Sequence, residues 1–187
     1  NAPIAKLPRP TSALPPLKGK NKKPRRNEPR VELRPILHHL TGGIDLSQVH
    51  GIAPYSSVQL ISEIGTDMTR WPSPGHFTSW LTLAPHNKVS GGRLLSSRTP
   101  TSSNRAAQIF RMAAMNVSRT DTALGAFYRR LAFPLGKAKA TTATPRKIAL
   151  LVYRALKGQI VYKDPGALAY DAHHKGLVPR RLQKRVG

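Results

Sequence analysis

The stretch that decides the fold is NRAAQIFRMAAMNV, residues 104–117, which has the periodicity of an amphipathic helix. Its apolar residues recur three, four and seven positions apart, as expected for one face of a helix: Ala106, Ile109, Phe110, Ala113 and Val117. Ser102 or Ser103, just before the stretch, is a suitable N-cap. We therefore expect a helix that buries one face against its neighbours.

Helical patterns also precede this stretch. We expect a short helix over residues 31–39, and a loop followed by a helix of two to three turns after residue 71, whose aromatic side chains we interpret as core. Between them, residues 43–65 predict two short helices joined by a turn at Gly51, which resembles a helix-hairpin-helix element. Pro54, close to that turn, has no N–H group to offer a phosphate.

Two more helices are predicted downstream. One begins at Asp121 or Thr122 and is ended by the proline and glycine that follow it. The other has Thr144 as its cap, Pro145 in its first position and Gly158 at its end. Together the patterns predict a compact, mostly α-helical domain.

Composition divides the chain into three parts. Residues 1–30 are rich in proline, lysine and arginine with hardly any large apolar side chain, which predicts a flexible basic arm or linker. Residues 31–162 carry the helical patterns and are expected to form the domain. Residues 163–187 lose the periodicity and end in basic residues, which predicts a disordered basic tail.

Basic residues far outnumber acidic ones. The chain holds 31 Lys and Arg against 8 Asp and Glu, a formal net charge of +23, and this charge runs along its whole length. Such a distribution favours nucleic acid as the partner. With no cysteine there is no thiolate catalysis and no cysteine-based zinc site. No apolar run approaches the roughly 20 residues of a membrane span, so we expect no membrane contact. The lack of cysteine is compatible with a reducing cytosol, and we expect a cytoplasmic protein.

A polar segment with no carboxylate, HNKVSGGRLLSSRTPTSSNR, occupies residues 86–105. Its Ser90 stands before two glycines, whose backbone N–H groups can approach an anion closely, and guanidinium groups bind phosphate through paired hydrogen bonds. The segment therefore predicts a phosphate site in which Ser90 either contacts the phosphate or attacks it. The nucleic-acid-binding residues predicted with it are Lys88, Gly91, Gly92, Arg93 and Arg98, followed by Arg105 and Arg111 on the next helix.

Other chemistries find little support in the sequence. The eight carboxylates are scattered along the chain, without the grouping that holds two magnesium ions. No phosphate-binding Walker loop or dinucleotide fingerprint is present. What remains is a serine among basic residues, which suits attack on a phosphodiester.

Four segments carry a specific resemblance: the QVHGI turn at residues 48–52, residues 62–92, which end in NKVSGG, the SNRAAQIFRMAA helix and the SRTDTALGAFYRRL helix. From about Asp45 to Tyr162 the chain resembles the C-terminal domain of IS110/IS116/IS902 family transposases, the bridge-RNA-guided serine recombinases. The family's serine falls on Ser90, and the resemblance implies that it is the catalytic nucleophile.

The resemblance also implies partners. In this family a RuvC-like domain with a DEDD set of carboxylates precedes the serine domain. We therefore expect no cofactor in this chain, with magnesium only at that missing domain. DNA and a bridge RNA are the expected partners, in a homo-oligomer associated with the bacterial nucleoid.

Two alternatives remain open from the sequence. One is a non-catalytic basic RNA-binding protein of the ribosomal type. The other is a truncated transposase that only binds nucleic acid. The resemblance itself implies that this chain alone binds DNA or RNA and has little or no strand-transfer activity.

Overall fold

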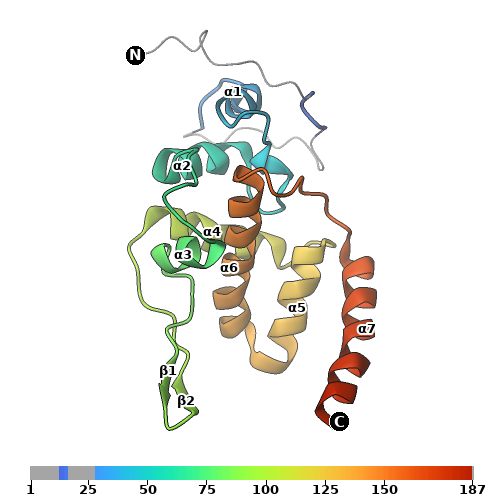
Figure 1. Cartoon of the computed structure of the whole chain (residues 1–187). Coiled ribbons are helices and arrows are strands. Elements are labelled where there is room, and N and C mark those ends of the chain that lie inside the picture. The colour runs from blue at the N-terminus through green and yellow to red at the C-terminus, as the bar shows by residue number, and fades with distance from the viewer. Residues whose placement is uncertain (1–12, 17–27, 187) are drawn as a thin grey trace.

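The computed structural model describes residues 13–16 and 28–186, with side chains as far as residue 176 (Figure 1). Most of the predicted basic arm and the end of the predicted tail lie outside these ranges. The described residues form seven α-helices, one 3-10 turn and one two-stranded sheet, which confirms the mostly α-helical prediction. In chain order the elements are α1 (Leu33–Leu40), η2 (Leu46–Gln48), α2 (Pro54–Ile64), α3 (Pro74–Trp80), β1 (Lys88–Ser90), β2 (Arg93–Ser96), α4 (Arg105–Val117), α5 (Ala123–Leu135), α6 (Lys137–Leu156) and α7 (Ala167–Val186).

The core is centred on α6, which packs against α3, α4 and α5 (Figure 1). Phe77, Phe110 and Tyr153, one from each of α3, α4 and α6, are fully buried. The Phe77 ring centre lies 6.4 Å from that of Phe110 and 5.6 Å from that of Tyr153. Trp71 is buried against Phe77, whereas Trp80 is partly exposed. The aromatic residues around α3 are thus mainly core, as the sequence predicts.

The helix caps agree with the sequence at α5 and differ at α4. Thr122 caps α5, because its Oγ1 accepts a hydrogen bond from the Gly125 N–H at 3.1 Å. At α4 the cap is Asn104, whose Oδ1 accepts from the Ala107 N–H at 3.1 Å, and not Ser102 or Ser103. Asparagine caps a helix as well as serine does, and Ser102 accepts the Asn104 N–H instead.

Helix α6 begins seven residues before the predicted cap at Thr144, so the prediction there is wrong. Gly136, at φ 85°, allows the chain to reverse directly from α5 into α6. Thr144 is buried inside the helix, and its hydroxyl donates to the Ala140 carbonyl at 2.8 Å. Packing of this first part of α6 against the core overrides the local signal of Pro145, which lies within the helix.

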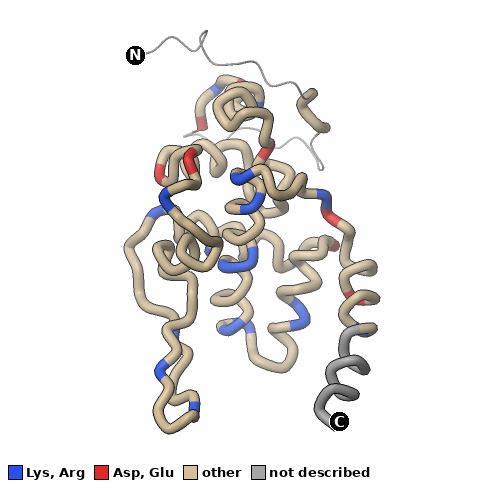
Figure 2. The backbone as a smooth tube through the Cα atoms, viewed as in Figure 1, with Lys and Arg blue, Asp and Glu red and all other residues tan. Residues whose placement is uncertain are grey.

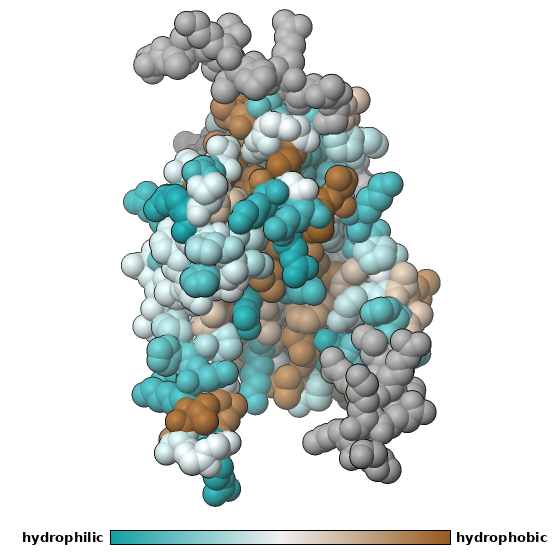
Figure 3. Space-filling model, viewed as in Figure 1, coloured by the Kyte–Doolittle hydropathy of each residue, from teal (hydrophilic) through white to brown (hydrophobic). Residues whose placement is uncertain are grey.

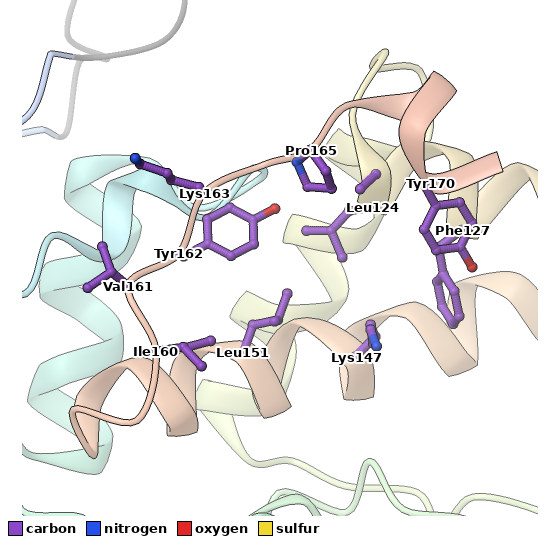
Figure 4. A pocket seen from close by; sticks show the side chains of 11 residues that line it. Leu124, Phe127, Lys147, Leu151, Ile160, Val161, Tyr162, Lys163, Pro165 and Tyr170 are labelled. Atoms are coloured by element: carbon purple, nitrogen blue, oxygen red, sulfur yellow. The ribbon is translucent and has the colours of Figure 1, made fainter. Parts of the chain in front are cut away.

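Residues 167–186, where the sequence predicts a disordered tail, form helix α7. Its first half packs on α5. The ring of Tyr170 lies edge-on to that of Phe127, with their centres 6.4 Å apart (Figure 4), and the Arg130 guanidinium lies over both rings. A helix held by so few apolar side chains has no clear apolar stripe in its sequence, which is why the periodicity did not predict it.

The predicted pair of short helices in residues 43–65 is η2 followed by α2, so its first member is only a single 3-10 turn. Gly51, between them, has φ 92° and lies so close to α4 that a Cβ atom there would be 2.5 Å from the Ala113 carbonyl oxygen. The turn is therefore packed against the core helix. None of the described helices is long and apolar enough to cross a membrane.

Candidate nucleic-acid interface: a basic β-hairpin

The predicted phosphate segment forms an antiparallel β-hairpin. Ser90 on β1 pairs with Arg93 on β2, and Val89 pairs with Leu94. Gly91 and Gly92 connect the strands at φ 54° and 74°. Positive φ at both central residues is typical of the type I′ turn that matches the twist of a hairpin. The two glycines thus build a tight turn beside Ser90. From the sequence, they were predicted only to let backbone N–H groups approach an anion closely.

The pairing gives the hairpin two different faces. Ser90 and its partner Arg93 lie on the same face. The register shifts between Lys88 and Val89, because β2 has one extra residue there. Side chains still alternate along β1, so Lys88 lies on the face of Ser90. Val89 and Leu94 form the other face and are 61% and 58% exposed. In Figure 3 the lower end of the molecule accordingly carries hydrophobic side chains beside hydrophilic ones. The nucleophile candidate and two cations therefore share one surface.

The hairpin projects from the helical body (Figure 1), and Figure 2 shows Lys and Arg along it without Asp or Glu. At its base the His86 N–H donates to the Arg98 carbonyl at 3.1 Å. Every strand residue except Ser96 is exposed, so no core holds the hairpin in place. A two-stranded hairpin of this kind is marginally stable alone, and contact with a polyanion would stabilise it.

The structure does not place all the predicted basic residues together. Lys88, Arg93 and Arg98 belong to the hairpin or its base, with Ser90 and the two glycines. Arg105 begins α4, and an extended segment, 97–104, separates it from β2, so α4 does not start at the glycine turn. Its guanidinium lies 3.6 Å from the Glu63 carboxylate and is highly exposed. Such a pair contributes little to stability.

Arg111 lies further along α4, half-buried in the helical body, so it does not join the hairpin either. The hairpin with Ser90 therefore contains four of the seven predicted binding positions outright: Lys88, Gly91, Gly92 and Arg93. Arg98 lies at its base, while Arg105 and Arg111 lie on α4, outside the hairpin.

Ser90 has cations near it but no base bound to it. None of the described side chains donates a hydrogen bond to its hydroxyl or accepts one from it. The described residues also include no group of three His, Cys, Asp or Glu side chains that could hold a metal ion. The arrangement can thus bind and polarise a phosphate, but it offers no metal and no general base of its own.

The structure contains a polar pocket that no sequence pattern predicted. Its lining comes from α3, from the segment leading into β1 and from Arg146 on α6. The sequence predicts the start of a helix at Pro145, and Arg146 follows directly. An arginine in the first turn of a predicted helix does not by itself indicate a site. Only the tertiary packing of α6 against α3 brings these residues together.

Residues 45–129 match the model of the protein family described as Transposase IS116/IS110/IS902 family. The matched segment contains η2, α2, α3, the hairpin and α4, and reaches into α5. Neither a curated protein nor a solved structure matches the chain.

This match supports one class of protein, a transposase, which is a DNA-binding recombination enzyme. More particularly, it supports a transposase of an insertion sequence, similar over residues 45–129 to the IS116/IS110/IS902 family. The hairpin that carries Ser90 lies inside the matched segment, whereas α6 and α7 lie outside it.

Proposed function

We propose that this chain is the serine-bearing catalytic domain of an insertion-sequence transposase and that Ser90 is its nucleophile. One observation carries the proposal: Ser90 stands beside a tight glycine turn, on the same exposed face as Lys88 and Arg93, in a hairpin with no carboxylate. Exposure lets a DNA strand reach the hydroxyl, and the lack of acidic groups leaves nothing on the hairpin to repel it.

The proposed reaction is a transesterification. The Ser90 hydroxyl gives up its proton, its oxygen bonds to the phosphorus of a DNA phosphodiester, and the bond from phosphorus to the leaving sugar oxygen breaks. That oxygen takes up a proton. The DNA is then held through a phosphoserine bond, and attack by a hydroxyl of a second strand reverses the step and joins the new pair of ends.

Arg93 and Lys88 have a definite role in this step. Negative charge builds on the non-bridging phosphoryl oxygens, and cations placed there stabilise it. The guanidinium of Arg93 suits two phosphoryl oxygens at once. Because Arg93 is the strand partner of Ser90, its guanidinium can reach a phosphate that the hydroxyl attacks.

The proposal requires further groups from outside the described residues. The family resemblance implies magnesium bound by a DEDD set of carboxylates, but the described residues contain no cluster that fits such a metal. We propose that a carboxylate-bearing domain, the bridge RNA and a second copy of the transposase complete the site. The proton acceptor for Ser90 would come from that composite site.

The test is the Ser90→Ala variant in a transposase that contains this chain and is loaded with its RNA. Loss of a nucleophile lowers the rate by roughly a thousandfold or more, so strand exchange should disappear while DNA affinity stays within about twofold, because many phosphate contacts remain. Ser97→Ala, an exposed serine just beyond β2, is the matched control and should keep full activity.

A nucleic-acid-binding role without catalysis is the second candidate. The observation in its favour is that Ser90 has no base among the described residues. This candidate, which includes a ribosomal-type protein or a truncated transposase, predicts that Ser90→Ala changes affinity at most and never a reaction rate.

A further inference from the structure

We propose that the polar pocket between α3 and α6 binds a backbone phosphate of the DNA strand that reaches the hairpin. This pocket, which we name the Arg146 pocket, has a volume of about 430 Å³. The choice of DNA as ligand rests on the proposed function. The binding of phosphate rests on the pocket itself, which is lined by Ser73, Gly75, His76, Ser79, Ala84, Pro85, Asn87 and Arg146.

Arg146 has a buried donor that lacks an acceptor within the described part of the chain. Its Nε atom is buried and has no hydrogen-bond partner among the described residues. A guanidinium is always charged in a protein, and leaving one of its donors buried without an acceptor is unfavourable. No carboxylate lines the pocket. Arg146 lines the pocket, so an anion that enters it would supply the missing charge, and a turn of the guanidinium toward that anion would give Nε–H its acceptor.

The groups around Arg146 include several hydrogen-bond donors and no carboxylate. The Ser73 hydroxyl and the Nδ1 atom of His76 lie 2.7 Å apart, which fixes the ring and leaves Nε2 as its other hydrogen-bonding atom. The Ser79 hydroxyl and the Asn87 amide add further donors to the lining. Donors without carboxylates suit a phosphate, and a single imidazole does not suit a metal ion.

The Arg146 pocket lies next to the hairpin. Pro85 and Asn87 lie in the segment that leads from α3 directly into β1, so the pocket opens at the base of the hairpin. Asn87 and Ser90 are three residues apart, which spans roughly 10 Å in an extended chain. A strand held at the Arg146 pocket would therefore pass the hairpin within reach of Ser90. The pocket would set the position of the DNA, while Ser90 acts on it.

The wild-type chain can be tested without any substitution. The Nε–H resonance of Arg146 is followed by NMR while inorganic phosphate, and then a short single-stranded DNA, is added. We expect a saturable shift of that resonance with both ligands, and little change for Arg154, which is exposed on the same helix and does not line the pocket. DNA binding that saturates without moving the Arg146 resonance would overturn the proposal.

Variants give an independent measurement of DNA affinity. Arg146→Gln and Arg154→Gln remove the same charge, but only the first removes the pocket's cation. Ser79→Phe fills the pocket and leaves the charge unchanged. We expect Arg146→Gln to weaken binding at least about fivefold and to lower the slope of log affinity against log salt by about 1. Ser79→Phe should weaken binding too, and Arg154→Gln by less than about twofold.

Equal losses for Arg146→Gln and Arg154→Gln, with none for Ser79→Phe, would show general electrostatics and contradict the pocket. If circular dichroism shows that Arg146→Gln does not fold, the Ser79→Phe variant and the wild-type titration test whether the pocket binds phosphate. Ser90→Ala separates this proposal from the proposed function. A Ser90→Ala protein that still exchanges strands, yet shows the Arg146 shift, refutes the nucleophile and leaves the phosphate pocket standing.

Discussion

Ser90 and Arg93 face each other across the hairpin, as paired residues of β1 and β2 joined only by Gly91 and Gly92. The hydroxyl and the guanidinium are therefore placed by backbone pairing and a two-residue turn, and not by core packing. Both glycines have open space around them, so their requirement is conformational and not steric. The geometry of the turn should thus control function separately from the stability of the helical body.

The turn can be disrupted without disturbing the core. A β-branched residue is strained at φ 54°, so Gly91→Val should unpair the strands, and the cost is about 1–2 kcal/mol. We expect the hairpin amides to exchange faster with solvent and DNA affinity to fall, with the melting temperature of the helical body unchanged. Gly91→Asn is the control, because asparagine tolerates the left-handed region. Equal behaviour of the two variants would argue against this role of the turn.

Gly125 should be essential for the packing of α5. A Cβ atom there would lie 2.1 Å from the Thr120 carbonyl oxygen and 2.8 Å from that of Val117. Both neighbours are backbone atoms, so Gly125→Ala is expected to destabilise the protein by about 1–3 kcal/mol, measured by thermal unfolding. Gly176→Ala is the matched control, since nothing lies within 4 Å of its added Cβ. A melting temperature for Gly125→Ala equal to that of the control would contradict the close approach.

A buried hydrogen bond ties α6 to the loop before α3. The Tyr153 hydroxyl donates to the Trp71 carbonyl at 2.7 Å, and Tyr153 is fully buried. Tyr153→Phe leaves that carbonyl without its partner, so we expect a loss of about 1–3 kcal/mol in urea unfolding with an unchanged m value. Tyr128→Phe removes only a half-buried contact with Thr141 and should cost clearly less.

The ion pair between Arg34 on α1 and Asp45 before η2 should make stability depend on pH. Burial raises the pKa of Asp45, but hydrogen bonds from Arg34, Ser47 and Gln48 outweigh it, so the net pKa lies below the ordinary 3.8. A lowered folded-state pKa stabilises the protein above pH 3.8, and this contribution is lost as the pH falls through the folded value.

The check is a series of chemical denaturation curves between neutral and strongly acidic pH. Asp45→Asn should be less stable than the wild type at neutral pH, and the difference should shrink as the solution is acidified. A constant difference across the series would show that the Asp45 charge does not matter.

The sequence predicted the helical body well because its signals are local. The stripe of Ala106, Phe110 and Val117 is buried in α4 as expected, and Thr122 caps α5. The extension of α6 before Pro145 could not be predicted in this way. Its cause is tertiary, since buried Ala140 and Thr144 hold that part of the helix against the core.

The assignment of Ser90, its glycines and its neighbouring cations to a site stays a prediction from residue types. The sequence did not predict the pairing that sets Arg93 opposite Ser90. The signal was present, because a diglycine between two short runs is typical of a hairpin turn. The Arg146 pocket had no such signal, since its residues come from distant segments and only the packing of α6 against α3 joins them.

The central claim is that Ser90 bonds covalently to DNA. The most direct measurement is to trap the reaction of the RNA-loaded transposase on a nicked DNA substrate whose released fragment diffuses away, and to identify the attached residue by mass spectrometry. We expect a phosphoserine bond at Ser90, absent in the Ser90→Ala variant and present in Ser97→Ala. A covalent adduct at another residue, or strand exchange by the Ser90→Ala protein, would contradict the account.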